Sequence, residues 1–154
     1  LDFDIVDIDP SAIRSVRLSD RFGQSVYLRR PPGSDNRSFR PAPPNETDRL
    51  ISRLAVSTTA LAVTQLSALD VKPMTELTTR PVANHISETF DGLEINLNAF
   101  REPDGLWVTL RAIEAGEGAR RAAAINGKAE GWAFRLSEYD FLDFTPDVTS
   151  LVER

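Results

Sequence analysis

The chain has 154 residues, of which 41% are hydrophobic and 27% are charged, and its formal net charge is −5. This composition predicts a single soluble domain over residues 1–154 and excludes a disordered chain. The acidic balance argues against a nucleic-acid partner, and a chain without cysteine has no disulfide, thiolate zinc site or cysteine nucleophile.

The first predicted element is a β-hairpin. Apolar residues alternate with polar ones on both sides of an Asp-Arg-Phe-Gly turn at 20–23, at Val16, Leu18, Val26 and Leu28. The polar segment 31–36 is a predicted loop, and residues 37–40 add a short third strand around Phe39.

The densest group of basic residues, Arg30, Arg37 and Arg40, lies in and beside this loop. Prolines surround the group, at Pro31, Pro32, Pro41, Pro43 and Pro44. We interpret the segment as a solvated connection whose positive charge compensates the acidic chain.

A helix is predicted to begin at Asn45, which is a suitable N-cap with Asp48 three residues later. Its apolar stripe is expected to pack on the hairpin and comprises Leu50, Ile51, Leu54 and Leu61. The Thr58-Thr59 pair ends this helix or begins a strand. For residues 61–73 the pattern leaves two alternatives, a longer helix or a strand.

Residues 84–111 predict a three-stranded meander. Asp91-Gly92 is typical of a two-residue type I′ turn, and residues 102–105 have the composition of a second turn. Alternating apolar residues follow each turn, namely Leu93, Ile95, Leu97 and Ala99, and then Leu106, Val108 and Leu110.

The C-terminal region predicts a helix over 119–129, a strand over 132–136, a short turn capped by Ser137, and a terminal helix that begins at 145–147 and docks through Val148, Leu151 and Val152. No residue-level repeat relates the two sheet units. The predicted fold class is α+β: a mainly antiparallel sheet from hairpin and meander units, with two or three helices packed on one side.

No catalytic, cofactor-binding or metal site is predicted. His85 is the only histidine, which excludes a cluster of histidine ligands, and its place at the start of a strand predicts an ordinary half-exposed side chain. The sequence contains no motif of a serine hydrolase, a P-loop or a dinucleotide-binding fold. The protein is therefore not expected to be an enzyme, and no cofactor is predicted.

Two acidic groups have more than one interpretation. The first group lies at the N-terminus and comprises Asp2, Asp4, Asp7 and Asp9. It has the alternate spacing of calcium ligands but lacks the loop glycine and the closing glutamate of a calcium-binding loop, so a frayed, solvated terminus is favoured over a calcium site. The second group lies near the C-terminus and comprises Glu138, Asp140, Asp143 and Asp147, interleaved with Tyr139, Phe141, Leu142 and Phe144. We expect its carboxylates on the solvated side of a turn and its apolar residues in the core.

The two tryptophans, Trp107 and Trp132, are either exposed anchors for a partner or core residues, and core packing is favoured. Trp107 is expected on the strand face opposite its apolar neighbours. A purely solvated face has no need of a tryptophan, so Trp107 is the stronger candidate for a partner surface.

Several segments of the chain resemble a known family. They are Asp9–Ile13, Thr89–Leu93, Ala124-Ile125-Asn126, the Gly-Trp-Ala-Phe-Arg-Leu segment at 131–136, Glu138-Tyr139 and Leu151-Val152. Together they cover nearly the whole chain, and they resemble the proteobacterial branch of the domain-of-unknown-function family 4340.

The resemblance implies a non-catalytic extracytoplasmic binding or scaffolding domain of the bacterial envelope, with envelope or ABC-transporter proteins as partners. It also implies a periplasmic or extracytoplasmic location and an N-terminal membrane anchor. The chain opens at Leu1 without a methionine, so such an anchor is expected upstream of it. The alternative is a small-molecule or polysaccharide binding module that uses Trp107 and the acidic segment 138–147.

Overall fold

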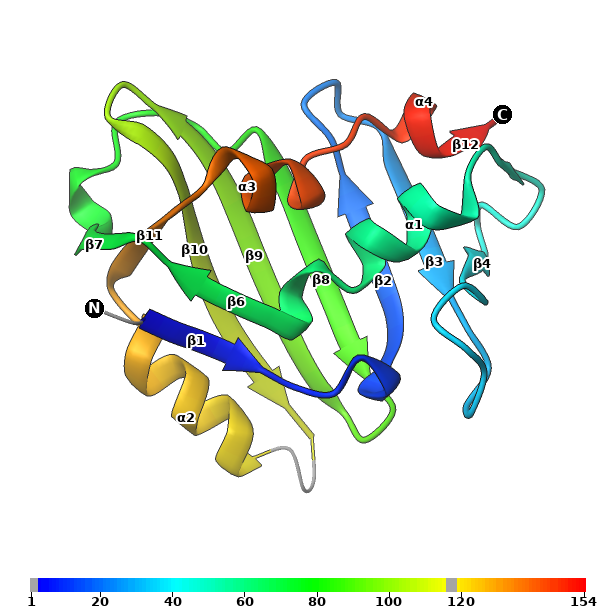
Figure 1. Ribbon diagram of the computed structural model, residues 1–154, viewed down its shortest axis with the longest axis horizontal. Helices are drawn as coiled ribbons and strands as arrows, with labels where there is room; N and C mark the ends of the chain where they lie inside the picture. Colours follow the sequence, from blue (N-terminus) through cyan, green and yellow to red (C-terminus); the bar gives the residue numbers. More distant parts are fainter. Residues whose placement is uncertain (1–2, 116–118) are drawn as a thin grey trace.

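The computed structural model describes residues 3–115 and 119–154. Its main element is an eight-stranded antiparallel sheet in the order β4-β3-β2-β8-β9-β10-β11-β7 (Figure 1). The strands are β2 (Ile13–Ser19), β3 (Ser25–Arg29), β4 (Arg40–Pro41), β7 (Asp70–Pro73), β8 (Ala83–Thr89), β9 (Leu93–Glu102), β10 (Gly105–Glu114) and β11 (Trp132–Leu136).

Shorter ribbons and helices lie around this sheet. β1 (Phe3–Asp7) pairs with β6 (Gln65–Ala68), and β5 (Arg49–Leu50) pairs with β12 (Val152–Glu153). The helices are α1 (Arg53–Ala60), α2 (Ala119–Ala129), α3 (Glu138–Phe144) and α4 (Val148–Leu151), with 3-10 turns η1 (Pro10–Ala12), η2 (Ala62–Thr64) and η3 (Met74–Glu76). No helix in the described part of the chain is long and apolar enough to cross a bilayer.

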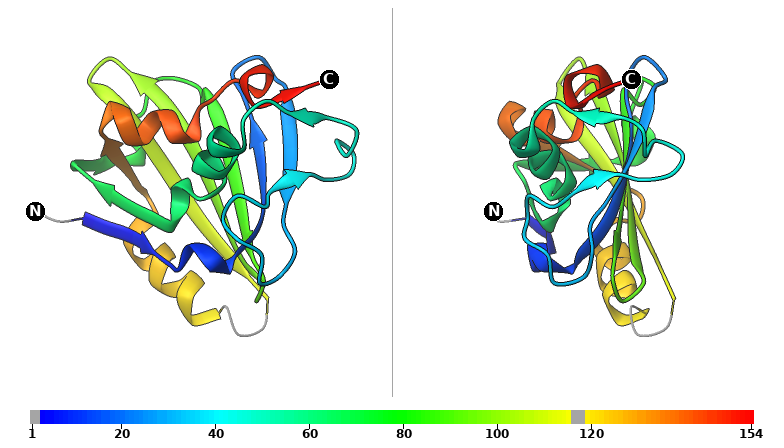
Figure 2. Two further views of the ribbon diagram at one scale, coloured as in Figure 1. Left: turned by 45° about the vertical axis from the view of Figure 1, so that its right-hand side comes forward. Right: turned by 90° about the vertical axis from the view of Figure 1, so that its right-hand side faces the viewer.

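The sheet has one covered face and one open face. The β1–β6 ribbon, α1, α3 and α4 lie on the same side of the sheet, which we call the inner face (Figure 2). Each large side chain buried here contributes about 1.5–3 kcal/mol, and these side chains include Leu18, Leu28, Ile95, Leu97, Phe141 and Phe144. The opposite side is the outer face, and within the described residues only its edge next to β10, β11 and β7 meets other elements, namely η3 and the C-terminal end of α2. The predicted α+β fold is confirmed.

The two sheet units form where the sequence predicts them. β2 and β3 make the first hairpin, with Val16 opposite Leu28, and β8, β9 and β10 make the meander. The turn after β8 is not the predicted type I′ turn, which needs a positive φ at both central residues, because there only Gly92 has one, at 95°. A Cβ atom on Gly92 would lie 3.0 Å from the Ala115 carbonyl oxygen, so this close approach also requires glycine.

The short strand predicted around Phe39 forms as β4, directly after that residue. β4 pairs with β3 and ends the sheet on this side. Phe39 itself is buried in the main core.

The helix predicted from Asn45 begins later, at Arg53. Ser52 is its N-cap, and its hydroxyl accepts a backbone N–H of the first turn at 3.2 Å. The Asn45 side chain instead accepts the Tyr27 N–H of β3. The predicted apolar stripe is also wrong, since Leu54 is 62% exposed. The residues that α1 buries are small or β-branched: Val56, Ser57, Thr59 and Ala60.

For residues 61–73 the strand alternative is correct. β6 joins β1, and β7 forms the far edge of the large sheet by pairing with β11. The same ribbon overturns the prediction of a frayed N-terminus, because the Ser67 hydroxyl donates to the Asp4 carboxylate at 2.6 Å across the β1–β6 pair. Asp2 lies outside the described residues.

The C-terminal elements follow the predicted order. Ser137 is the N-cap of α3, as predicted, and its hydroxyl accepts the Asp140 N–H at 3.1 Å. α4 begins at Val148, whose N–H donates to the Asp20 carboxylate at 2.8 Å. The terminal helix is therefore anchored to the turn of the first hairpin.

α2 closes an open strand edge. β11 pairs with β10 only from Leu106 to Val108, so Ala112 has no strand partner on that side. The Asn126 side chain of α2 takes this place: its Oδ1 accepts the Ala112 N–H and its Nδ2 donates to the Ala112 oxygen, both at 2.8 Å. One carboxamide thus replaces the peptide group of a neighbouring strand.

Candidate functional site

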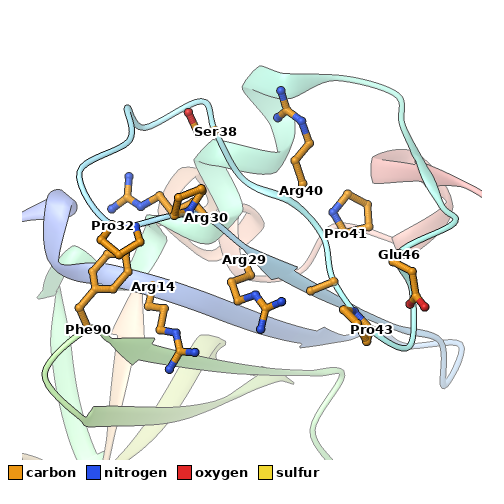
Figure 3. Close-up of a pocket in the computed structure, with 12 residues that line it drawn as sticks. Arg14, Arg29, Arg30, Pro32, Ser38, Arg40, Pro41, Pro43, Glu46 and Phe90 are labelled. Atoms are coloured by element: carbon orange, nitrogen blue, oxygen red, sulfur yellow. The ribbon is translucent and has the colours of Figure 1, made fainter.

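A groove at the β4 end of the sheet is the main candidate site (Figure 3). It has a volume of about 680 Å³ and is lined from β2, β3, β4, the adjoining loops and the turn after β8. We call it the arginine groove. Its lining residues are Arg14, Arg29, Arg30, Pro31, Pro32, Ser38, Arg40, Pro41, Ala42, Pro43, Glu46 and Phe90. The excess of arginine contrasts with the net charge of −5 of the whole chain.

Strand pairing brings the exposed arginines of the groove to the outer face. Arg40 of β4 lies opposite Arg29 of β3, so their side chains leave the sheet on the same face. Arg14 lies where the register between β2 and β8 is irregular, and it contacts Glu88 of the outer face at 3.4 Å. In Figure 3 the Arg29 and Arg40 side chains point to opposite rims of the groove.

Arg29 and Arg40 carry charge that no described carboxylate neutralises. The ion pairs within residues 3–115 and 119–154 include neither of them. The Arg40 Nη1 donates to the Arg37 oxygen at 3.2 Å and to the Phe39 oxygen at 2.8 Å, so backbone carbonyl groups hold this side chain at its rim. Guanidinium groups bind carboxylates with two parallel hydrogen bonds, so each rim offers a cation to a bound anion.

Arg30, the next residue, has a structural role. It is only 3% exposed, and burial lowers the pKa of its guanidinium. Its Nε donates to the Ile13 oxygen at 2.7 Å, its Nη1 to the Asn36 side chain at 3.1 Å, and its Nη2 to the Pro10 oxygen. The guanidinium also lies 4.7 Å from the centre of the Phe39 ring. The prediction of a solvated connection is therefore wrong for Arg30, because the loop folds back over it.

Apart from Ser38 and Glu46, apolar groups form the rest of the groove. Phe90 stands at the exposed tip of the β8–β9 turn. The lining prolines have fixed φ angles and no backbone N–H, so this wall loses little conformational entropy when a ligand binds. Guanidinium groups around an apolar wall suit an anionic group that is carried on a less polar chain.

A second recess lies further across the outer face. It has a volume of about 490 Å³ and is bounded by β9, β10, Met74 and the C-terminal end of α2. We call it the asparagine recess; the side chains that line it from the strands are Asn96, Asn98, Thr109 and Arg111. Asn84 orders two of them, because its Nδ2 donates to the oxygens of Asn96 at 2.7 Å and of Asn98 at 3.0 Å.

His85 is fully buried, which contradicts the prediction of a half-exposed side chain. It lies on the inner face of β8 opposite Leu18, and its Nε2 donates to the Thr59 oxygen at 2.7 Å. Burial lowers the pKa of His85 to about 4, so the ring is neutral at pH 7. It lines neither recess.

Trp107 belongs to a small core on the outer face, as the core interpretation predicts. It is 3% exposed, its Nε1 donates to Asp104 at 2.9 Å, and the Lys72 ammonium lies 4.4 Å from the ring centre. The residues that cover it are Phe100, Ala133 and Leu77. Trp132 is the more exposed of the two tryptophans.

In the acidic segment around α3, the buried and exposed side chains differ in part from the prediction. Phe141 and Phe144 are buried as expected, but Tyr139 and Leu142 are exposed, because a helix of this length turns only one side to the sheet. Burial raises the pKa of the Asp143 carboxyl. Within the described ranges no three His, Cys, Asp or Glu side chains gather as a metal site.

Arg14 and Arg29 were not recognisable from sequence as parts of the groove. Arg29 alternates with buried Leu28 in a predicted strand, which places it on the solvated face but names no neighbour. Arg14 joins the groove only through the pairing of β2 with the distant β8. No short motif marks either residue.

Comparison with known proteins gives no match to a family model, a curated protein or a solved structure. The function is therefore inferred from the chemistry of the residues themselves.

Proposed function

We propose that this chain is a non-catalytic binding domain that holds an acidic segment of a protein partner in the arginine groove. The observation that carries the proposal is the charge of Arg29 and Arg40, which no described carboxylate neutralises. A chain with 23 acidic and 18 basic residues has carboxylates in excess. Glu46 is the one carboxylate among the lining residues and Arg14 contacts Glu88, so the groove keeps an excess of positive charge that an anion from another molecule would neutralise.

The preferred anion is a carboxylate group on a polypeptide. The negative charge of the whole chain repels a long polyanion such as nucleic acid, whereas a short acidic segment is attracted once it lies within the Debye length of the groove. Phe90 and the proline wall offer apolar contacts to the side chains between the acidic residues.

The cellular setting is proposed from the family resemblance. The domain would lie outside the cytoplasm, in a bacterial envelope or ABC-transporter assembly, and the acidic segment would belong to another protein of that assembly. Fractionation of cells that carry the native gene should place the full-length protein in the envelope. Recovery in the cytosolic fraction alone would contradict this setting without affecting the groove.

The binding proposal is tested by fluorescence anisotropy with a labelled peptide of alternating glutamate and alanine, about eight residues long. Arg29→Gln and Arg40→Gln should each weaken binding about tenfold, because a charge-assisted hydrogen bond contributes about 1.5–3 kcal/mol. The matched control is Arg120→Gln, which removes an exposed arginine of α2 outside the groove. Added salt should weaken binding to the unchanged protein.

Three results would contradict the proposal: no measurable binding of the glutamate peptide, equal binding of a glutamine–alanine peptide, or equal losses of affinity in the groove variants and the Arg120 control.

The polysaccharide alternative loses one support, because Trp107 is buried. An oligogalacturonate probe tests what remains of it. If that probe binds more tightly than the peptide and depends on Arg29, the ligand of the groove is an acidic glycan instead.

A further inference from the structure

We infer that the outer face is one continuous binding surface, along which an extended acidic segment crosses the strands from the arginine groove to the asparagine recess. The inference rests on the proposed function, because it specifies how the bound segment lies. Between the two recesses the outer face carries no helix of the described residues (Figure 2).

A row of side chains leads from β3, next to the arginine groove, to the asparagine recess. Residues directly opposite each other on neighbouring strands form it, and they are Tyr27, Arg17, Ile86, Asn96 and Arg111. Arg17 and Arg111 are exposed, and Ile86 lies between them with a partly exposed side chain. The row therefore offers a cation in its middle, a cation at its far end and an apolar contact between them.

The distribution of charge selects an acidic occupant and its path. Arg29 and Arg40 are at one end of the path, Arg17 is in the middle and Arg111 is at the other end. Two carboxylates of the outer face, Glu88 and Glu94, lie opposite each other in the neighbouring row, which leads from Arg40 and Arg29 through Ser15. Beyond the arginine groove they repel an acidic segment from that row, so the segment is directed to the row of Arg17.

The asparagine cluster is suited to bind the main chain of the segment. Asn84 donates to the side-chain oxygens of Asn96 and Asn98, which fixes both carboxamides with their nitrogens turned away from it. Neither nitrogen donates to another described residue, so each can donate to a peptide carbonyl. A peptide held by its backbone here and by its carboxylates in the groove would be recognised at two places.

Strand spacing gives the length of the segment. Three strand intervals separate β3 from β9, which at about 4.8 Å each is a distance of about 14 Å. An extended chain advances about 3.3 Å per residue, so about four residues bridge the recesses and about eight fill both. A peptide of about three residues reaches the arginine groove alone.

The test compares a glutamate–alanine peptide of about eight residues with one of about three. The long peptide should bind at least about tenfold more tightly, because its second contact is intramolecular. Arg111→Gln and Asn96→Asp should weaken the long peptide about fivefold to tenfold and leave the short one unchanged. Arg111 is exposed, and Asn96→Asp keeps the side-chain oxygen that Asn84 binds, so both variants should fold.

The outcomes separate this inference from the proposed function. If Arg29→Gln weakens both peptides but Arg111→Gln and Asn96→Asp weaken neither, the continuous surface is wrong and the arginine groove stands. Equal affinity of the long and short peptides in the unchanged protein would also overturn the continuous surface. If neither peptide binds, the proposed function itself fails. Far-UV circular dichroism and thermal unfolding of each variant show whether a loss of binding comes from unfolding.

Discussion

The His85 imidazole meets the Phe144 ring edge to face, with ring centres 5.2 Å apart and an angle of 79° between the planes. This contact joins β8 of the sheet to α3 of the inner layer. The His85 Nε2 also donates to Thr59 of α1, while its Nδ1 is buried without a partner in the described structure. One neutral ring therefore connects the sheet to two helices.

Acid should weaken this connection. The folded protein keeps His85 neutral until about pH 4, whereas in the unfolded chain it takes up a proton near its ordinary pKa of 6.5. The unfolded state therefore binds more protons between these values, and the free energy of unfolding should fall by about 3 kcal/mol as the pH drops from 7 to 4. Urea titrations at several pH values measure this. His85→Gln keeps a donor for Thr59 without titrating, and its stability should lack this component; parallel pH profiles of the two proteins would refute the assignment.

Arg29 and Arg30 are neighbours in sequence, but only the replacement of Arg30 should lower the free energy of unfolding substantially. Arg30→Met removes the donors of the Pro10 and Ile13 carbonyl groups, so the free energy of unfolding should fall by about 2–4 kcal/mol. Arg29→Met changes an exposed side chain and should alter it by no more than about 0.5 kcal/mol. Denaturant unfolding of both variants checks this; similar losses would show that Arg29 is structural too.

Two glycines should respond to alanine with opposite sign. Gly92 has a positive φ, and an added Cβ would meet the Ala115 oxygen at 3.0 Å, so Gly92→Ala should destabilise the protein by about 1–3 kcal/mol. Gly127 lies in α2, where an added Cβ meets nothing within 4 Å. Gly127→Ala should therefore stabilise it by about 0.5–1 kcal/mol. Thermal unfolding distinguishes the two, and a stabilising Gly92→Ala would contradict the described turn.

Asn126 should protect the open edge of β10. Asn126→Ala removes both hydrogen bonds to Ala112, so the Ala112 amide should exchange faster with deuterium and the protein should lose about 1–3 kcal/mol. Asn126→Asp keeps an acceptor for that amide and should leave its exchange slower than in the alanine variant. Arg120→Ala, an exposed change in the same helix, is the control. Unchanged exchange at Ala112 in Asn126→Ala would show that another group covers this edge.

Local patterns predicted most of the sheet. The hairpin around Val16 and the meander around Ile95 combine strict alternation with a turn sequence, and both signals act over neighbouring residues. The helix predicted at Asn45 failed because Asn45 binds the backbone of β3 instead. α1 begins at Ser52 and buries mostly small side chains, so hydrophobic periodicity gave no sign of its true position.

The candidate site could be predicted from the sequence to a much smaller extent than the sheet. Arg30 and Arg40 were noticed as a basic group, but alternation along a strand does not tell which arginine a folded loop will cover. Arg30 is buried and Arg40 is exposed. The groove itself depends on Arg14, which reaches it through a pairing between distant segments. His85 was misplaced for a related reason, because β8 carries polar residues on both faces: His85, Ser87 and Thr89 are buried, whereas Asn84 and Glu88 are not.

The order of strands in the sheet has a kinetic consequence. β2, β3 and β4 are near neighbours in the chain, as are β8, β9 and β10, so each group can form through short connections. The two groups meet in the sheet only where β2, at residues 13–19, pairs with β8, at residues 83–89. Closing that long loop costs more entropy than any hairpin in either group. The slow step of folding should therefore be the meeting of two preformed half-sheets, and the outer face that spans them is complete only after it.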